Sequence, residues 1–131
     1  MAETTFSIRE LCDEFDVTPR TLRFYESKGL LAPHREGQRR LFTVRDRTRL
    51  KLILRGKRFG FSLAEIKELL DLYDREDDQR TQLAATLEAA RRHYGELREK
   101  RKELDSVLAE LEAHMQELES MLADETHRES A

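Results

Sequence analysis

The sequence predicts a mostly α fold, in which a small winged helix-turn-helix domain is followed by one long dimerising coiled-coil helix. Three patterns lead to this prediction: two short capped helices around a turn at Asp16-Val17, an arginine-rich segment over residues 32–42, and a leucine repeat from Leu83 to Leu122. Charged residues make up 39% of the 131-residue chain and hydrophobic residues 38%, with only two prolines. This composition is typical of helices with long solvated faces and little β structure.

The first two helices are delimited by capping residues. Ser7 and Glu10 have the spacing of a capping box, and the apolar residues around them share one helical face: Ile8, Leu11, Cys12 and Phe15. Thr18 supplies a capping hydroxyl for the second helix, Pro19 suits its first position, and Gly29 is a stop signal. Two short helices joined by a tight turn, the second with arginines and a tyrosine, are typical of a helix-turn-helix that binds double-stranded DNA.

Basic residues are concentrated immediately after these helices. Residues 32–42 contain a proline, a glycine and three arginines, and they predict a β-hairpin wing that turns near Glu36-Gly37. The segment 35–58 holds 10 basic and 2 acidic residues. Residues 1–60 carry 14 Lys/Arg against 8 Asp/Glu, whereas residues 61–131 carry 10 against 19. A solvated face would explain any single run, but this density beside a helix-turn-helix fits neutralisation of DNA phosphates.

Two further helices follow the wing. A capping pattern at 43–46 opens a helix that ends at about Arg58, and a second capping pattern at 62–65 opens another. Apolar residues at helical spacing extend the second of these helices over residues 63–73. The acidic stretch 74–78 is interpreted as a hinge.

A 3.5-residue repeat predicts a coiled coil in the C-terminal half. The repeat alternates steps of four and three residues through Leu83, Leu87, Ala90, Tyr94, Leu97, Arg101, Leu104, Leu108, Leu111, Met115, Leu118 and Leu122. Only Arg101 departs from apolar character, and nearly six heptads form a specific coiled-coil signal. A helix of roughly 60 Å cannot bury this seam on so small a domain, so we expect it to pair with a second chain in a homodimer.

The charges beside this seam predict an antiparallel pair. With Leu87 at an a position, the e positions change from positive to negative along the helix: Arg91, Arg98, Asp105, Glu112 and Glu119. In an antiparallel pair e faces e′, so opposite charges meet when the two-fold axis lies near Arg101. We therefore expect a winged helix-turn-helix domain over 5–74, an antiparallel dimerisation coiled coil over 80–122, and a polar, frayed tail over 123–131.

Several classes of function and site are disfavoured. There is no glycine-rich phosphate loop, nucleophile–base pair or metal-ligand cluster, so we expect neither an enzyme nor a cofactor. His93 and His114 are too far apart for one metal ion and are interpreted as solvated residues at the edge of the coil. Cys12, the only cysteine, lies on an apolar face and is expected to be a buried, inert thiol. No membrane span or signal-peptide core is apparent, so the expected compartment is the cytoplasm.

The order of these elements resembles the MerR family of bacterial transcription regulators. The matching stretches are FSIRELCDEFDVTPRTLRFYESKGLLAP at 6–33, RRLF at 39–42 and GFSLAEIKELL at 60–70. Members of this family act at promoters whose two polymerase elements are spaced too far apart, and they bend and untwist the DNA between them. The resemblance therefore implies distortion of promoter DNA, with an inverted-repeat site and an indirect effect on RNA polymerase.

The resemblance also assigns roles to residues of this chain. The implied DNA-binding set is Thr18, Arg20, Thr21, Arg23, Tyr25, Arg39, Arg40, Phe42, Lys57 and Arg58. Arg20 and Arg23 lie three apart on one helical face, where arginine suits guanine edges and phosphates alike. Tyr25 is a candidate phosphate contact, with a core position as the alternative. Phe42 belongs to the wing or seals the core.

The effector end departs from the metal-sensing members of the family. Those members carry cysteines at the start of the long helix and in a loop after it, whereas residues 74–80 and 121–131 here contain none. We therefore expect a small organic effector, if any. Within the family, the cysteine-free build and residues 45–74 resemble regulators of branched-chain amino acid and isovalerate breakdown, which implies effectors of the acyl-CoA type.

A homodimeric transcription regulator is the leading hypothesis, and two alternatives stay open. One is an architectural DNA-binding protein without an effector. The other is a coiled-coil adaptor whose helix-turn-helix only contacts proteins, against which the basic density over 35–58 argues.

Overall fold

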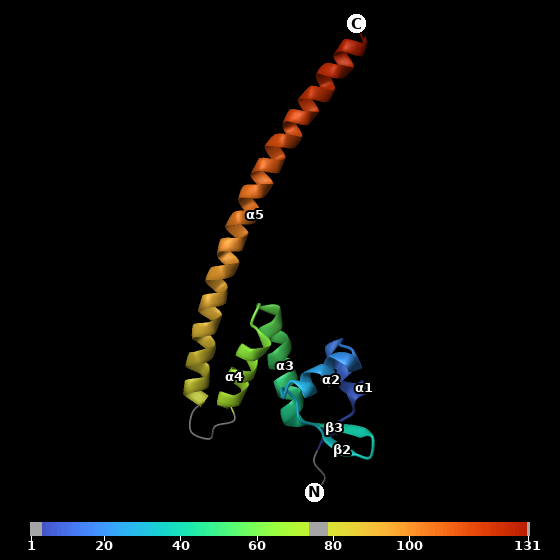
Figure 1. Ribbon diagram of the computed structural model, residues 1–131, viewed down its shortest axis with the longest axis vertical. Helices are drawn as coiled ribbons and strands as arrows, with labels where there is room; N and C mark the ends of the chain where they lie inside the picture. Colours follow the sequence, from blue (N-terminus) through green and yellow to red (C-terminus); the bar gives the residue numbers. More distant parts are fainter. Residues whose placement is uncertain (1–3, 74–78, 131) are drawn as a thin grey trace. The chain divides into compact units, whose positions relative to one another are not determined.

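The computed structural model describes residues 4–73 and 79–130, and it divides the chain into two compact units, Met1–Ala90 and Arg91–Ala131. The elements follow in the order β1, α1, α2, β2, β3, α3, α4 and α5 (Figure 1). The name N-terminal unit denotes Met1–Ala90, and helical extension denotes the part of α5 from residue 91 onward.

Helices α1 (Ile8–Phe15) and α2 (Pro19–Ser27) confirm the predicted helix-turn-helix. The Ser7–Glu10 capping box is present, and Thr18 caps α2. At the end of α2, Gly29 takes a left-handed φ of 75°, and the amide of Leu30 donates to the Tyr25 carbonyl at 2.9 Å. Glycine is suited to this left-handed stop because it has no Cβ to clash.

The predicted wing is present as a hairpin of β2 (His34–Glu36) and β3 (Arg39–Thr43), which turns at Gly37 with a φ of 64°. A third strand, β1 (Thr5–Phe6), pairs antiparallel with β3, which gives the order β1-β3-β2. β1 was not predicted from the sequence, because two residues are too short to show an alternating pattern. Its register places Phe6 opposite Phe42.

Helices α3 (Val44–Arg58) and α4 (Leu63–Tyr73) have the predicted bounds and caps. Asp46, only 3% exposed, accepts hydrogen bonds from the Thr43 amide and from the Ala32 amide, both at 3.0 Å. This carboxylate therefore ties the segment after α2 to the start of α3. Gly56 packs directly on Ile66 of α4, since an added Cβ would lie 3.0 Å from two of its carbons.

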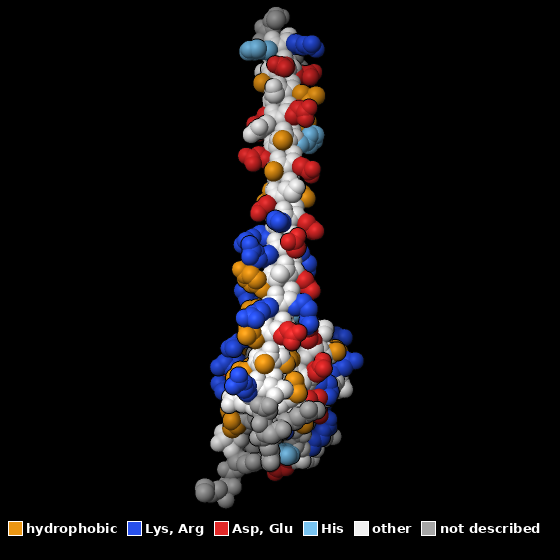
Figure 2. Space-filling model, turned by 90° about the vertical axis from the view of Figure 1, so that its left-hand side faces the viewer, with side chains coloured by type: hydrophobic (Ala, Val, Ile, Leu, Met, Phe, Trp, Pro, Cys, Tyr) orange, Lys and Arg blue, Asp and Glu red, His pale blue; other side chains and the backbone are white. Residues whose placement is uncertain are grey.

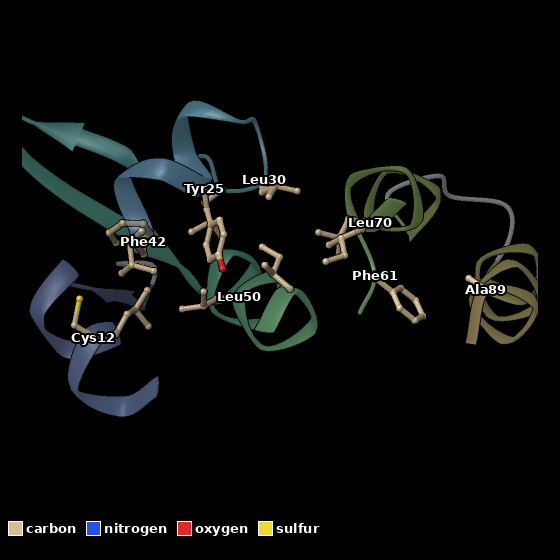
Figure 3. Close-up of a cluster of buried hydrophobic side chains, with 13 residues drawn as sticks. Cys12, Tyr25, Leu30, Phe42, Leu50, Phe61, Leu70 and Ala89 are labelled. Atoms are coloured by element: carbon tan, nitrogen blue, oxygen red, sulfur yellow. The ribbon is translucent and has the colours of Figure 1, made fainter. Parts of the chain in front are cut away.

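One apolar core joins the elements of the N-terminal unit. Its fully buried large side chains are Phe42, Leu11, Leu22, Leu30, Leu50 and Ile53. Figure 3 shows Tyr25, Leu30, Leu50 and Leu70 converging between α2, α3 and α4, while the Phe61 ring lies on the side of Ala89. Ala89 belongs to the first turns of α5, so these turns complete the core.

Helix α5 (Gln79–Ser130) is 52 residues long, about 78 Å at 1.5 Å per residue. It exceeds the predicted length because residues 123–130, expected to be a frayed tail, continue the helix. The predicted hinge at 74–78 lies outside the described residues. No helix in the described ranges is long and apolar enough to cross a membrane.

Candidate nucleic-acid interface

The exposed face of α2 carries two arginines whose charges are not neutralised by neighbours. Arg20 and Arg23 are both exposed, and within residues 4–73 and 79–130 neither makes a hydrogen bond or an ion pair. Phe24, 45% exposed, lies next to Arg23 in the chain, and the Lys28 Nζ is 5.6 Å from its ring centroid. This exposed aromatic was missed, because an apolar residue in a short helix looks like a core residue in the sequence. Three cations and one aromatic ring are thus available to a ligand of α2.

Thr18 and Thr21 hold the first turn of α2 in place. The Thr21 amide donates to Thr18 Oγ1 at 3.2 Å, and the two hydroxyl oxygens are 2.9 Å apart. Both predicted site residues therefore position the helix that carries the arginines.

Tyr25 and Phe42 lie in the core, the alternative that the sequence left open for each of them. Phe42 is 0% exposed and Tyr25 is 7% exposed, and burial raises the pKa of the Tyr25 phenol. Tyr25 therefore offers little surface to a ligand. The two rings set the position of α2 against β3.

Glu26 of α2 anchors the wing. Its carboxylate accepts from Arg40 Nε at 2.6 Å and lies 3.5 Å from Arg35 Nη2. Arg40 is therefore held against α2 on one side, whereas Arg39 is exposed and unpaired within the described ranges. Sequence reasoning missed Glu26, because its hydrogen-bond partner is 14 positions away and no local spacing links them.

The basic residues of 35–58 do not form one continuous surface, which corrects the argument from their density. Arg49 is 8% exposed, and its Nε donates to the Leu30 carbonyl at 2.8 Å. Arg47 forms a two-point ion pair with Glu14 of α1, with 2.9 Å between Nε and Oε1. Its guanidinium carbon also lies 5.9 Å from the ring centroids of Phe6 and Phe15. The pair lowers the pKa of Glu14 and raises the pKa of Arg47. Both arginines stabilise the fold.

Lys57 and Arg58 form a separate pair of basic side chains. Both are exposed at the C-terminal end of α3, and they make no ion pair in the part of the chain that the structure describes. The wing lies at the other end of α3 (Figure 1). Since α3 has 15 residues, its two ends are about 22 Å apart. The predicted residues thus fall into three groups: α2, the wing and the end of α3.

The predicted dimerisation residues are exposed along α5. The leucine seam comprises Leu83, Leu87, Tyr94, Leu97, Arg101, Leu104, Leu108, Leu111, Met115 and Leu118, and every one is exposed in the single chain. Val107 and Met121, at g positions, are also exposed and widen the apolar stripe. Figure 2 shows apolar side chains along the helix, with Lys and Arg gathered on its lower part and Asp and Glu above.

Metal-binding side chains do not cluster in the part of the chain that the structure describes. Within 4–73 and 79–130 there is no group of three or more His, Cys, Asp or Glu that could hold one. His93 and His114 each face a glutamate one turn away, Glu96 at 3.4 Å and Glu117 at 3.9 Å. Cys12 is buried, and this burial raises the pKa of its thiol, so the thiolate is disfavoured.

Known proteins share this arrangement. Residues 6–77 match the family described as MerR HTH family regulatory protein, and residues 47–114 match the one described as MerR, DNA binding. The HTH-type transcriptional regulator CueR of Salmonella typhimurium is 31% identical over 117 residues, which cover 88% of this chain and 72% of CueR. ZntR of Escherichia coli K12 is 41% identical over 69 residues, which cover 51% of this chain and 49% of ZntR.

Solved structures agree with the sequence matches. A MerR family transcriptional regulator from Bacillus cereus has a TM-score of 0.66 and 29% identity, covering 81% of this chain and 76% of that one. HiNmlR, a MerR family regulator lacking the sensor domain and bound to promoter DNA, has a TM-score of 0.61 and 27% identity. The match covers 78% of this chain and 80% of the HiNmlR chain. PbrR691 from Ralstonia metallidurans CH34, in complex with lead(II), has a TM-score of 0.61 and 35% identity. The match covers 81% of this chain and 82% of the PbrR691 chain.

The family match spans more than half of the chain, and the fold, the wing and the long helix agree with it. This protein therefore belongs to the MerR family of DNA-binding transcription regulators, which are not enzymes.

Proposed function

We propose that this protein binds promoter DNA sequence-specifically as a homodimer, on an inverted repeat. The unpaired Arg20 and Arg23 on the exposed face of α2 are the observation that carries the proposal. The planar guanidinium can donate two hydrogen bonds to a guanine edge, and each such contact discriminates by about 1–3 kcal/mol. Arg39 of the wing and Lys57 in the last turn of α3 would contact phosphates on either side. The promoter complex of the similar HiNmlR supports this proposal.

The dimer is proposed to form through the leucine seam, with the two α5 helices antiparallel. Residues 79–102 carry seven Lys/Arg and three Asp/Glu. Residues 103–130 carry one Lys/Arg and nine Asp/Glu. An antiparallel pair centred near residue 101 brings each basic half against the acidic half of its partner. A parallel pair would place like charges together along the whole length. Charge complementarity therefore favours the antiparallel arrangement.

We further propose that binding distorts the promoter between the two half-sites, so that RNA polymerase is affected indirectly. This part rests on family membership. Smooth bending of such a site costs on the order of 1–6 kcal/mol, which contacts from α2 and the wing on both half-sites can offset. Circular-permutation gel shifts measure the bend directly, and straight DNA in every complex would contradict it.

The effector is proposed to be a small organic molecule. PbrR691 was solved with lead(II), but here the one cysteine is buried in the N-terminal unit and the described residues hold no metal-donor cluster. A Cys12→Ser variant should therefore show no tight binding of Zn, Cu or Hg ions that changes DNA affinity. Such binding in calorimetry would contradict this part of the proposal.

DNA binding is tested by fluorescence anisotropy with specific and random duplexes at several salt concentrations. Arg23→Ala should weaken specific binding by about 1–3 kcal/mol and random binding much less, because it removes a base contact. Lys57→Ala should weaken both equally and lower the salt slope by roughly one. Lys102→Ala, which removes a charge from the helical extension, is the matched control. Equal losses on both duplexes for Arg23→Ala would exclude its base-reading role.

A further inference from the structure

An apolar pocket in the N-terminal unit lies where α3, α4 and the first turns of α5 meet. Its volume is about 150 Å³, and apolar side chains dominate its lining: Leu52, Phe59, Phe61, Ile66, Leu69 and Ala90. An engineered cavity of about this volume, with similar lining, accommodates a benzene ring. The pocket therefore has the size and character for a compact apolar group of about six carbons.

Three polar side chains border this apolar space, and one of them, Thr86, donates its hydroxyl to the Gln82 carbonyl at 2.7 Å. Gln82 is 9% exposed, and among the described residues its side-chain amide has no hydrogen-bond partner. Every fully buried side-chain nitrogen or oxygen in the described ranges does have a partner, so the Gln82 amide must retain open surface. Gln82 also lines the pocket, so its amide is available to a ligand there. An amide held in this way offers a donor and an acceptor.

The third polar group is Arg55 of α3. It lines the pocket and is exposed, and its guanidinium forms no ion pair or hydrogen bond within residues 4–73 and 79–130. Arg47 and Arg49 on the same helix differ, since each is engaged by a protein acceptor. A guanidinium at the edge of an apolar pocket suits a carboxylate, which it can bind through two parallel hydrogen bonds.

We propose that this pocket binds a small monocarboxylic acid with one compact branched or aromatic apolar group. The apolar group fills the space between α3, α4 and α5, the carboxylate meets Arg55, and the Gln82 amide donates the second polar contact. The inference rests on the proposed organic effector and names its class and its place. Such a ligand would join α4 to the first turns of α5, which carry the start of the leucine seam.

The probe is benzoate, and its binding to the full chain is measured by calorimetry without DNA. We expect saturable binding of one benzoate per chain, and weaker binding of benzyl alcohol, which lacks the charge. Arg55→Gln should weaken the binding of benzoate roughly 10–100-fold, which is the usual range for a hydrogen bond to a charged group. The same variant should leave the affinity for benzyl alcohol unchanged. Arg9→Gln removes an exposed charge from α1 and should leave benzoate binding unchanged.

Position in the pocket is tested separately by NMR of methyl groups. Benzoate should shift the methyls of Leu52, Ile66 and Leu69, whereas those of Leu104 and Leu111 should stay. Absence of saturable binding, an unchanged affinity in Arg55→Gln, or shifts confined to the helical extension would each overturn the proposal. DNA affinity of the ligand-free protein is measured in parallel. Lost DNA binding with intact benzoate binding would refute the proposed function, and the reverse would refute this pocket alone.

Discussion

The N-terminal unit and the helical extension use the same kinds of apolar residue in opposite ways. Leucines 11, 22, 30 and 50 are at most 1% exposed, whereas Leu104 and Leu108 are more than 60% exposed. The first group comes from four different segments that the fold brings together. The second group lies along one helix, which has no other element to pack against within its own unit. An isolated stripe of this length calls for a second helix.

Charged residues differ between the two regions as well. In the N-terminal unit, two ion pairs join distant elements, Glu14 with Arg47 and Glu26 with Arg40, beside the local pair of Lys67 and Asp71. In the helical extension, His114 lies 3.9 Å from Glu117 one turn further along the same helix, a local contact that is an ion pair only when the histidine is protonated. The first kind fixes the tertiary structure, whereas the second leaves most charges available to a partner.

The largest effect is expected from charges placed in the leucine seam. Leu104→Lys with Leu111→Lys should abolish the dimer, because each lost leucine costs about 2–5 kcal/mol and each chain loses two. Ser106→Lys with Ala113→Lys adds the same charges at the same spacing on the outward face and should leave the dimer intact. Sedimentation equilibrium distinguishes the two. Equal dissociation in both variants would show that the seam is not the interface.

Truncation of the core should come next. Phe42→Ala is expected to lower the free energy of unfolding by about 3–5 kcal/mol, because the ring is fully buried between β3 and the helices. Phe24→Ala removes an equal ring that is 45% exposed and should change stability by only about 0.5 kcal/mol. Denaturant unfolding measures both. Similar losses would contradict the placement of these two rings.

A smaller effect on dimer affinity is expected from the charges that favour one orientation of the two helices. In the proposed antiparallel dimer Arg98 would face Asp105 of the partner subunit, so Arg98→Asp should weaken the dimer by about 1 kcal/mol over two exposed pairs. Adding Asp105→Arg should restore the affinity, because the pairs form again with their signs exchanged. Lys102→Asp, outside the seam, is the control. A double variant weaker than either single one would argue for parallel helices.

Much of the fold was predictable because its signals are local. Caps at Ser7, Thr18 and Thr43, and the glycines at 29 and 37, fixed the helix and hairpin bounds that the structure has. The roles of individual basic residues were not predictable in the same way. Arg23 and Arg49 look alike in the sequence, but one is exposed and the other donates to a backbone carbonyl 19 positions away. Only the tertiary fold separates binding arginines from structural ones.

The same limit applies to the pocket and to the N-terminal strand. Arg55 and Gln82 lie on different helices, and no spacing rule relates them until α5 packs on the core. β1 is formed by only two residues and depends on β3 for its hydrogen bonds. Features made of a few residues from distant segments need the assembled fold.

The smallest effect concerns the Glu14–Arg47 pair and its dependence on pH. Arg47 holds the pKa of Glu14 below its ordinary value of 4.5, so protonation favours the unfolded chain. The stabilisation is therefore fully present above pH 4.5 and is lost as the pH falls through the lower pKa of the folded state. Glu14→Gln should lower the midpoint of thermal unfolding at pH 7, and this difference from the unsubstituted protein should close once the pH is low enough to protonate Glu14 in the folded protein. Glu103→Gln, the same change in the helical extension, should show no such closing difference. If the unfolding midpoint of Glu14→Gln stays below that of the unsubstituted protein in acid, the Glu14 side chain stabilises the fold by packing rather than by its charge.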